Sequence, residues 1–119
     1  MTHPLTGKRI LIVEDEFIVA IAAEDMLIGF GAIVVGPAAT VAEGLALATQ
    51  PLDGAVLDIN MHGERSYAVA RALRARDVPF VFATGYADVD GNEVGESPVV
   101  AKPYGADELG AALRRAMRL

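Results

Sequence analysis

The sequence contains no cysteine and no tryptophan, only two lysines and two histidines, and no long apolar run. The absence of cysteine excludes disulfides, thiolate nucleophiles and cysteine-based zinc or iron–sulfur sites. No stretch approaches the roughly 18 apolar residues of a membrane span, and the first nine residues do not have the pattern of a signal peptide. We therefore expect a cytoplasmic domain with no membrane contact and no redox chemistry of its own.

Positive charge is also scarce. Ten lysines and arginines stand against sixteen aspartates and glutamates, which gives a net charge of −6. This is the wrong sign for binding the phosphate backbone of nucleic acids, so direct nucleic-acid binding is not expected. What is abundant is apolar material: 53% of the 119 residues are hydrophobic, enough for one folded domain with one core.

Five short apolar segments alternate with helical segments along the chain. The apolar segments, which read as buried strands, cover residues 9–13, 32–35, 54–57, 79–83 and 99–101. The expected helices cover residues 17–30, 41–49, 67–75 and 106–117, with a weak helical turn or two within 87–97. Such alternation predicts an α/β fold, a doubly wound parallel sheet with helices on both faces.

Some local features carry further expectations. Thr40 and Glu43 form a capping box whose side chains bind backbone amides at the start of a helix. Gly36 and Pro37 should end the second strand, and residues 60–65 read as a polar loop. The first helix is apolar almost all round, so either its neighbours cover it or one side is an interface.

Polar side chains follow four of the five predicted strands, at the point where each strand ends. They are Glu14, Asp15, Asp58, Thr84 and Lys102. Parallel strands place their carboxyl ends at one edge of the sheet, where ligands bind. Three crowded carboxylates would resist full ionisation, and Mg²⁺, which prefers oxygen ligands, would relieve their repulsion.

Lys102 can reach toward these acids, because only a long flexible cation spans the distance between separated strands. Thr84 can donate a hydroxyl, and Gly85 beside it leaves space for a phosphoryl oxygen. An acceptor carboxylate, a metal and two donors are the components of phosphoryl transfer to a carboxylate, with Asp58 as the acceptor.

These residues resemble the receiver domains of two-component response regulators. The resemblance extends from Arg9 to about Met117 and rests on the four runs IVEDE, VLDINM, ATG and AKPY, in residues 12–16, 56–61, 83–85 and 101–104. It implies a flavodoxin-like sheet with strand order 2-1-3-4-5 in a single receiver domain, residues 1–119 with a core at 8–118. It also implies that Asp58 accepts a phosphoryl group from a sensor histidine kinase or a histidine phosphotransfer protein.

The resemblance further implies a role for each site residue. Asp15, Asp58 and the backbone carbonyl of Asn60 would hold Mg²⁺, with Mn²⁺ as an alternative ion, and Glu14 would act largely through water. Thr84 and Lys102 would bind the phosphoryl group, and the peptide bond before Pro103 would be cis. The domain would then lose its phosphoryl group slowly to water, so it would not be an enzyme with an external substrate.

The run PFVFATGY, residues 79–86, is also similar to a narrower group of receivers with a Phe-Ala-Thr-Gly-Tyr motif, many of them stand-alone. One position departs from the wider family. Val99 stands where most receivers carry a tyrosine or phenylalanine that rotates on activation. We therefore expect the switch to involve Thr84 and Gly85 with Tyr86 or Tyr104.

Two other functions compete with this interpretation. A small phosphatase of the haloacid-dehalogenase type also uses an aspartate, Mg²⁺, Thr and Lys, but its second aspartate would replace Asn60. A pseudo-receiver that only binds partners should have lost an acid or Lys102, and all are present. His62, in the loop after Asp58, is expected to be a solvent-exposed histidine rather than a ligand.

The assembly of the protein stays open at this stage. We expect a monomer or a weak homodimer that contacts a downstream protein. The sequence does not decide whether the domain acts alone or belongs to a larger regulator.

Overall fold

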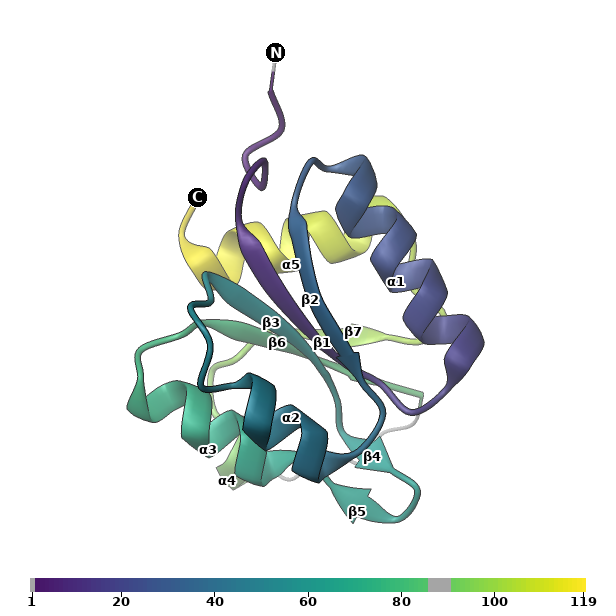
Figure 1. Ribbon diagram of the computed structural model, residues 1–119, viewed down its shortest axis with the longest axis vertical. Coiled ribbons are helices and arrows are strands. Elements are labelled where there is room, and N and C mark those ends of the chain that lie inside the picture. Colours follow the sequence, from purple (N-terminus) through teal and green to yellow (C-terminus); the bar gives the residue numbers. More distant parts are fainter. Residues whose placement is uncertain (1, 86–90) are drawn as a thin grey trace.

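A computed structural model describes residues 2–85 and 91–119. Its centre is a five-stranded parallel sheet with helices on both faces (Figure 1), in the order β2-β1-β3-β6-β7. The strands are β1 (Arg9–Val13), β2 (Ile33–Ala38), β3 (Gly54–Asp58), β6 (Phe80–Thr84) and β7 (Val99–Ala101). The order confirms the flavodoxin-like prediction of 2-1-3-4-5, because β4 and β5 form a separate hairpin.

The second strand departs from its prediction. It continues through Gly36 and Pro37 to Ala38 instead of ending before them. Because β2 is an edge strand that pairs only with β1, the missing N–H of Pro37 costs no bond on the outer side, and the register shifts there. The same position leaves Ile33 47% exposed, so β2 is not fully buried.

Residues 60–65, predicted as a polar loop, contain a small antiparallel hairpin. Its strands are β4 (Asn60–Met61) and β5 (Glu64–Arg65), which pair with each other alone. The two residues between them, His62 and Gly63, have φ angles of 54° and 85°. Positive φ at both central positions is typical of a two-residue hairpin turn. The strands on either side have only two residues each, too few for the sequence pattern to predict the hairpin.

In the part of the chain that the structure describes, five helices cover the sheet. They are α1 (Phe17–Gly29), α2 (Val41–Leu47), α3 (Tyr67–Ala75), α4 (Gly91–Val94) and α5 (Ala106–Met117). Helices α1 and α5 lie on one face and α2 and α3 on the other (Figure 1). The four-residue α4 agrees with the weak fourth helix, although residues 87–90 of that prediction lie outside the described part. None of the helices in residues 2–85 and 91–119 has the length and hydropathy needed to span a bilayer.

Side chains of each strand alternate between two cores, one on each face of the sheet. Leu11 and Leu57 pack toward α2 and α3, while Ile10, Ile12 and Val56 pack toward α1 and α5. All five are at most 2% exposed. Burial on both faces is why these strands read as continuous apolar runs in the sequence.

The capping box at α2 forms with one difference from its prediction. The hydroxyl of Thr40 accepts a hydrogen bond from the backbone N–H of Glu43 at 3.0 Å, as expected. The carboxylate of Glu43, however, accepts from the Thr40 hydroxyl at 3.2 Å and not from a backbone amide. One amide is therefore capped instead of two.

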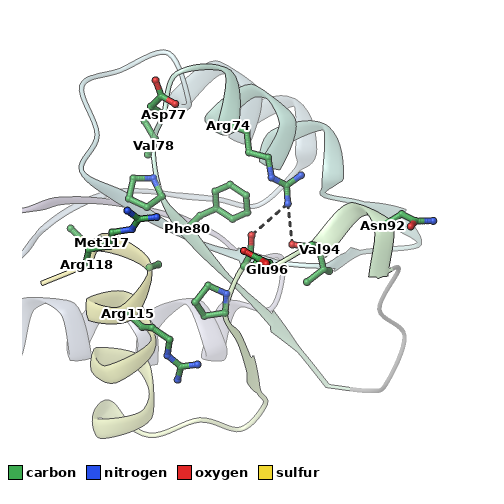
Figure 2. A pocket seen from close by; sticks show the side chains of 15 residues that line it. Arg74, Asp77, Val78, Phe80, Asn92, Val94, Glu96, Arg115, Met117 and Arg118 are labelled. Atoms are coloured by element: carbon green, nitrogen blue, oxygen red, sulfur yellow. Dashed lines mark hydrogen bonds between the residues drawn. The ribbon is translucent and has the colours of Figure 1, made fainter.

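Helix α4 is fastened to α3 by two arginines. Arg71 donates from Nη1 to both carboxylate oxygens of Glu93, at 2.8 and 2.9 Å. Arg74 donates to the carbonyl oxygens of Glu93 and Val94. Its guanidinium lies over the ring of Phe80, 5.1 Å from the ring centroid, and Figure 2 shows this side chain between Phe80 and Val94. Because α4 has only one turn, these side-chain contacts replace much of the stability that a longer helix would have.

Candidate functional site

The predicted site residues meet at one edge of the sheet. The parallel strands β1, β3, β6 and β7 all end at this edge, as the register of Asp58 beside Ala83 shows. Glu14 and Asp15 directly follow β1, Asp58 is the last residue of β3, and Lys102 directly follows β7. Three distant parts of the chain are thus brought together by the direction of the strands.

Four carboxylates form a cluster at this edge. Oxygens of Glu14, Asp15, Glu16 and Asp58 all lie within 4.8 Å of one another. Glu14 and Asp58 are only 4% exposed. Glu16 is a member that sequence reasoning did not single out, although it belongs to the IVEDE run; its backbone N–H donates to Oε2 of Glu14 at 3.0 Å.

Lys102 places its ammonium group inside this cluster. Its Nζ lies 2.8 Å from Oε1 of Glu14, 3.1 Å from Oδ2 of Asp58 and 3.3 Å from Oε1 of Glu16. The side chain of Lys102 is 11% exposed, so the ammonium is held largely away from solvent. The long side chain does bridge from β7 to Asp58, as predicted, and the peptide bond between Lys102 and Pro103 is cis, as the resemblance implied.

The electrostatics of the site favour a proton on Asp58. Burial raises the pKa of Asp58 to about 8; the hydrogen bond and negative charge of Glu14 add to the rise, and Lys102 opposes it. Burial also acts to raise the pKa of Asp15, but hydrogen bonds with Asp58 and Glu14 and the charge of His62 outweigh it and lower that pKa. Burial works to lower the pKa of Lys102, yet hydrogen bonds with Glu14 and Asp58 hold it above its usual value.

A cavity of about 120 Å³ opens beside Asp58. Its lining residues are Glu16, Asp58, Ile59, Asn60, Arg65, Thr84, Gly85 and Lys102. This volume exceeds the roughly 30 Å³ that one water occupies in the liquid, so a small polar group fits. The predicted residues Asn60, Thr84 and Gly85 therefore share one cavity with Asp58 and Lys102.

The predicted switch residues are only partly accounted for. Tyr86 lies outside the described residues. Tyr104 is partly buried against the core on the α1 and α5 face, and burial raises its pKa to about 12, with the charge of Glu14 adding to the rise. Val99, which occupies the usual aromatic position, is 43% exposed. Tyr104 also lines a cavity of about 470 Å³ next to Lys102, between α1 and the segment that follows β7.

His62 reaches the acid cluster, which the sequence did not indicate. Its side chain is 80% exposed, as expected for a loop histidine, yet its Nε2 lies 3.3 Å from Oδ2 of Asp15. The hairpin turn, invisible in the sequence pattern, brings it there.

The site fits a divalent cation. Four carboxylates surround one ammonium group, and the buried Oδ2 of Asp58 accepts no hydrogen bond within the described residues. Oxygen donors of this kind are the ligands that Mg²⁺ prefers.

A larger cavity of about 1100 Å³ lies at the opposite edge of the sheet, beside Phe80 at the start of β6 (Figure 2). None of the residues of the acid cluster lines it.

Comparisons with known proteins agree with this geometry. The family model described as the response regulator receiver domain matches residues 10–114. The solution structure of SdrG from Sphingomonas melonis Fr1 is similar, with 42% identity, a TM-score of 0.83, and coverage of 95% of this chain and 98% of SdrG. The receiver domain of a sensor histidine kinase from Pseudomonas aeruginosa PAO1, with a magnesium ion in its active-site cleft, is 28% identical with a TM-score of 0.81. That similarity covers 96% of this chain and 100% of the Pseudomonas domain.

A curated relative extends beyond the domain. The regulatory protein VirG of Rhizobium rhizogenes is 28% identical over 121 residues, which cover 93% of this chain and 48% of VirG. This chain therefore spans about half the length of that relative. With the family model matched over most of the sequence, the chain belongs to the response regulator receiver domains, the signalling domains of two-component systems.

Proposed function

We propose that Asp58 is the phosphoacceptor of this receiver domain and that its donor is a phosphohistidine on a sensor histidine kinase or a phosphotransfer protein. The observation that carries this proposal is the contact of Lys102 with Asp58 at 3.1 Å inside a buried acid cluster. A lysine beside a buried aspartate neutralises the charge that an incoming phosphoryl group adds.

In the reaction, an Oδ atom of Asp58 attacks phosphorus in line with the phosphohistidine nitrogen. The new P–O bond forms as the P–N bond breaks, and the donor imidazole leaves with the electron pair and takes up a proton. The Lys102 ammonium and the Thr84 hydroxyl bind the phosphoryl oxygens in the 120 Å³ cavity. Water later attacks the phosphorus of the acyl phosphate, the P–O bond to Asp58 breaks, and inorganic phosphate leaves as the carboxylate is regenerated, which is the slow self-dephosphorylation we expect.

Asp15, Asp58 and the backbone carbonyl of Asn60 would hold Mg²⁺, and Glu14 would act through water. When bound, the ion supplies positive charge that offsets the carboxylates and the phosphoryl oxygens. The magnesium ion described for the Pseudomonas receiver domain supports this assignment, as does the cluster of four carboxylates in this chain. Mn²⁺ would be an alternative ion for the same oxygen ligands.

The phosphodonor protein would dock on α1. Phe17 and Ile18 are 76% and 81% exposed at the start of this helix, directly after Glu16 of the acid cluster. Ile18 also lines the 470 Å³ cavity with Lys102 and Tyr104. Exposed apolar groups beside a reactive carboxylate are suited to a protein donor rather than to a small free substrate. This placement favours the second explanation given above for the many apolar residues of α1, namely that one side of the helix is an interface with a partner.

Phosphorylation would signal through Thr84 and Gly85, with Tyr104 nearby, and change binding to a downstream protein. We place the domain in the cytoplasm as a monomer or weak homodimer, and in the Phe-Ala-Thr-Gly-Tyr subgroup. The names of the relatives given above include no phosphatase, so the haloacid-dehalogenase alternative gains no support from them. The retained acids and Lys102 argue against the pseudo-receiver.

The test is phosphorylation by acetyl phosphate, a small donor that needs no partner, with Mg²⁺ present. Phosphate-affinity gel electrophoresis should show a retarded band for the wild type that is absent after EDTA and absent in Asp58→Asn. Asp53→Asn is the matched control, because Asp53 lies before β3 and binds the backbone N–H of Arg9 away from the site. Asp53→Asn should be retarded like the wild type, and an unretarded wild type would remove the proposal.

A further inference from the structure

His62 is held over the acid cluster by the hairpin that carries it. Strands β4 and β5 pair Asn60 with Arg65 and Met61 with Glu64, and Met61 is buried with 4% exposure. The backbone N–H of Gly63 donates to Oδ1 of Asn60 at 2.8 Å, which closes the turn. The imidazole is thus presented by an anchored turn, and not by a free loop.

The imidazole has one polar partner within the described residues, Oδ2 of Asp15 at 3.3 Å, and its side chain is otherwise 80% exposed. It contributes little to the core, so packing does not account for its position. Asp15 is one of the acids assigned above to the metal site. His62 is therefore placed to act on that site.

The distance between the two donor atoms fits joint binding of one ion. Two ligands at right angles on an octahedral ion, each about 2.1 Å from it, lie roughly 3.0 Å apart. Nε2 of His62 and Oδ2 of Asp15 are 3.3 Å apart. Ligand atoms of Glu14, Glu16 and Asp58 lie within 4.8 Å of one another and of Asp15, and within the described residues His62 meets this cluster through Asp15.

We propose that His62 is an additional ligand of this metal site, which would then take divalent ions that favour imidazole, such as Ni²⁺, better than its oxygen donors alone allow. Carboxylate and carbonyl oxygens suit Mg²⁺ and Mn²⁺, whereas imidazole nitrogen suits Ni²⁺, Zn²⁺ and Fe²⁺. This inference rests on the metal site of the proposed function. It adds a ligand and a selectivity to that site.

A ligand can be distinguished from a residue that only orients Asp15. A histidine that hydrogen-bonds Asp15 without touching the ion would support all ions alike, and its loss would weaken Mg²⁺ and Ni²⁺ by the same factor. Loss of a nitrogen ligand should weaken Ni²⁺ far more than Mg²⁺. The ratio of the two dissociation constants is therefore the informative quantity.

The experiment is calorimetric titration of the unphosphorylated protein with Ni²⁺ alone and with Mg²⁺ alone. All samples carry His3→Gln, which removes the only other histidine, one that stacks on Phe30 away from the site. His62→Asn is the test variant, because asparagine also tolerates the positive φ of this turn. His62→Asn should bind Ni²⁺ at least about tenfold more weakly than its parent and Mg²⁺ within about twofold.

Equal effects on the two ions, or none on either, would overturn the role of His62 as a ligand. If the parent still bound Mg²⁺ and the Asp58→Asn substitution abolished that binding, the proposed function would stand without the role of His62. If the parent bound neither ion, the metal site and the inference would both fall.

Discussion

Nζ of Lys102 lies 3.1 Å from Oδ2 of Asp58, although within residues 2–85 and 91–119 that buried oxygen accepts no hydrogen bond of good geometry. The ammonium makes its closer contact with Glu14, at 2.8 Å. Lys102 thus compensates the charge of the acid cluster without occupying the lone pairs of Asp58. Burial raises the pKa of Asp58 to about 8, the hydrogen bond and negative charge of Glu14 add to the rise, and Lys102 offsets only part of it.

The raised pKa predicts how stability depends on pH in metal-free protein. A carboxyl with a pKa of about 8 in the folded chain, against the usual 3.8, keeps its proton longer when folded. The contribution of Asp58 to the free energy of unfolding is therefore complete at about pH 4 and is lost as the pH rises toward 8. Asp58→Asn, which cannot ionise, should match the wild-type Tm near pH 4 and exceed it by about 5 °C or more at pH 8.

The measurement is thermal unfolding by circular dichroism in EDTA across this pH range. Asp53→Asn serves as the exposed control. If the difference in Tm between the wild type and Asp58→Asn were the same at pH 4 and pH 8, the burial and repulsion assigned to Asp58 would be wrong.

The same ionisation predicts the pH dependence of magnesium binding. The ion needs the deprotonated carboxylate, so it must displace the proton of Asp58 below about pH 8. The dissociation constant for Mg²⁺ should therefore rise as the pH falls from 8 to 6, by up to about tenfold per pH unit. Calorimetry in buffers of different ionisation heat should also detect a released proton; a dissociation constant independent of pH would contradict this.

Lys102→Met should destabilise the metal-free protein at neutral pH. The substitution keeps much of the side-chain volume but leaves Glu14 and Asp58 buried with no cation beside them. Breaking a buried ion pair costs about 3 kcal/mol, and the pair lost at neutral pH is mainly the one with Glu14, because Asp58, with a pKa of about 8, already holds most of its proton. Lys8→Met, at the only other lysine, should change the free energy of unfolding by less than about 0.5 kcal/mol. Urea denaturation measures both; similar small losses would show that Lys102 is not essential to the cluster.

Two glycines in helices should respond in opposite ways to alanine. A Cβ on Gly44 would lie 3.1 Å from Cγ2 of Val69 and 3.2 Å from Cγ2 of Val13, both stiff side chains of buried residues. A Cβ on Gly29 would meet nothing within 4 Å. Alanine has the higher helix propensity, so Gly29→Ala should stabilise by a few tenths of a kcal/mol. Gly44→Ala should destabilise by about 1 kcal/mol, because the overlap outweighs propensity; stabilisation would mean that α2 shifts freely on the sheet.

Arg74 should control the local opening of α4. Arg74→Met removes its contacts with the carbonyl oxygens of Glu93 and Val94 and takes the guanidinium from the ring of Phe80, while it keeps an unbranched apolar side chain. Amide hydrogen exchange at residues 94–97 should accelerate about fivefold to tenfold. Arg115→Met is the matched control, because Arg115 lines the same cavity (Figure 2) and its side chain makes no hydrogen bond with the described residues. Unchanged exchange in Arg74→Met would show that Arg71 and the buried Val94 hold α4 without Arg74.

The sequence predicted the sheet and the meeting of the acids with Lys102 because both depend on strand direction. Apolar runs without alternation require burial on both faces, and parallel strands bring their ends to one edge. The strand pattern was therefore enough to predict that Asp58 and Lys102 lie beside the acids that follow β1.

The features it did not predict depend on tertiary context. The passage of β2 through Gly36 and Pro37 depends on its edge position, which only the strand order determines. The contact of His62 with Asp15 depends on a hairpin of two-residue strands, too short for any periodic pattern. The carboxylate of Glu43 could accept from a backbone amide or from the Thr40 hydroxyl, and the spacing of the two residues does not determine which.

The most direct test of the central claim is to locate the phosphoryl group. The wild-type protein, treated with acetyl phosphate and Mg²⁺, would be digested at acidic pH and fragmented by tandem mass spectrometry. The peptide containing Asp58 should carry the phosphoryl group on that residue, and the modification should disappear with hydroxylamine, which cleaves acyl phosphates. Phosphate found on another residue, or on none, would contradict the assignment of Asp58 as the acceptor.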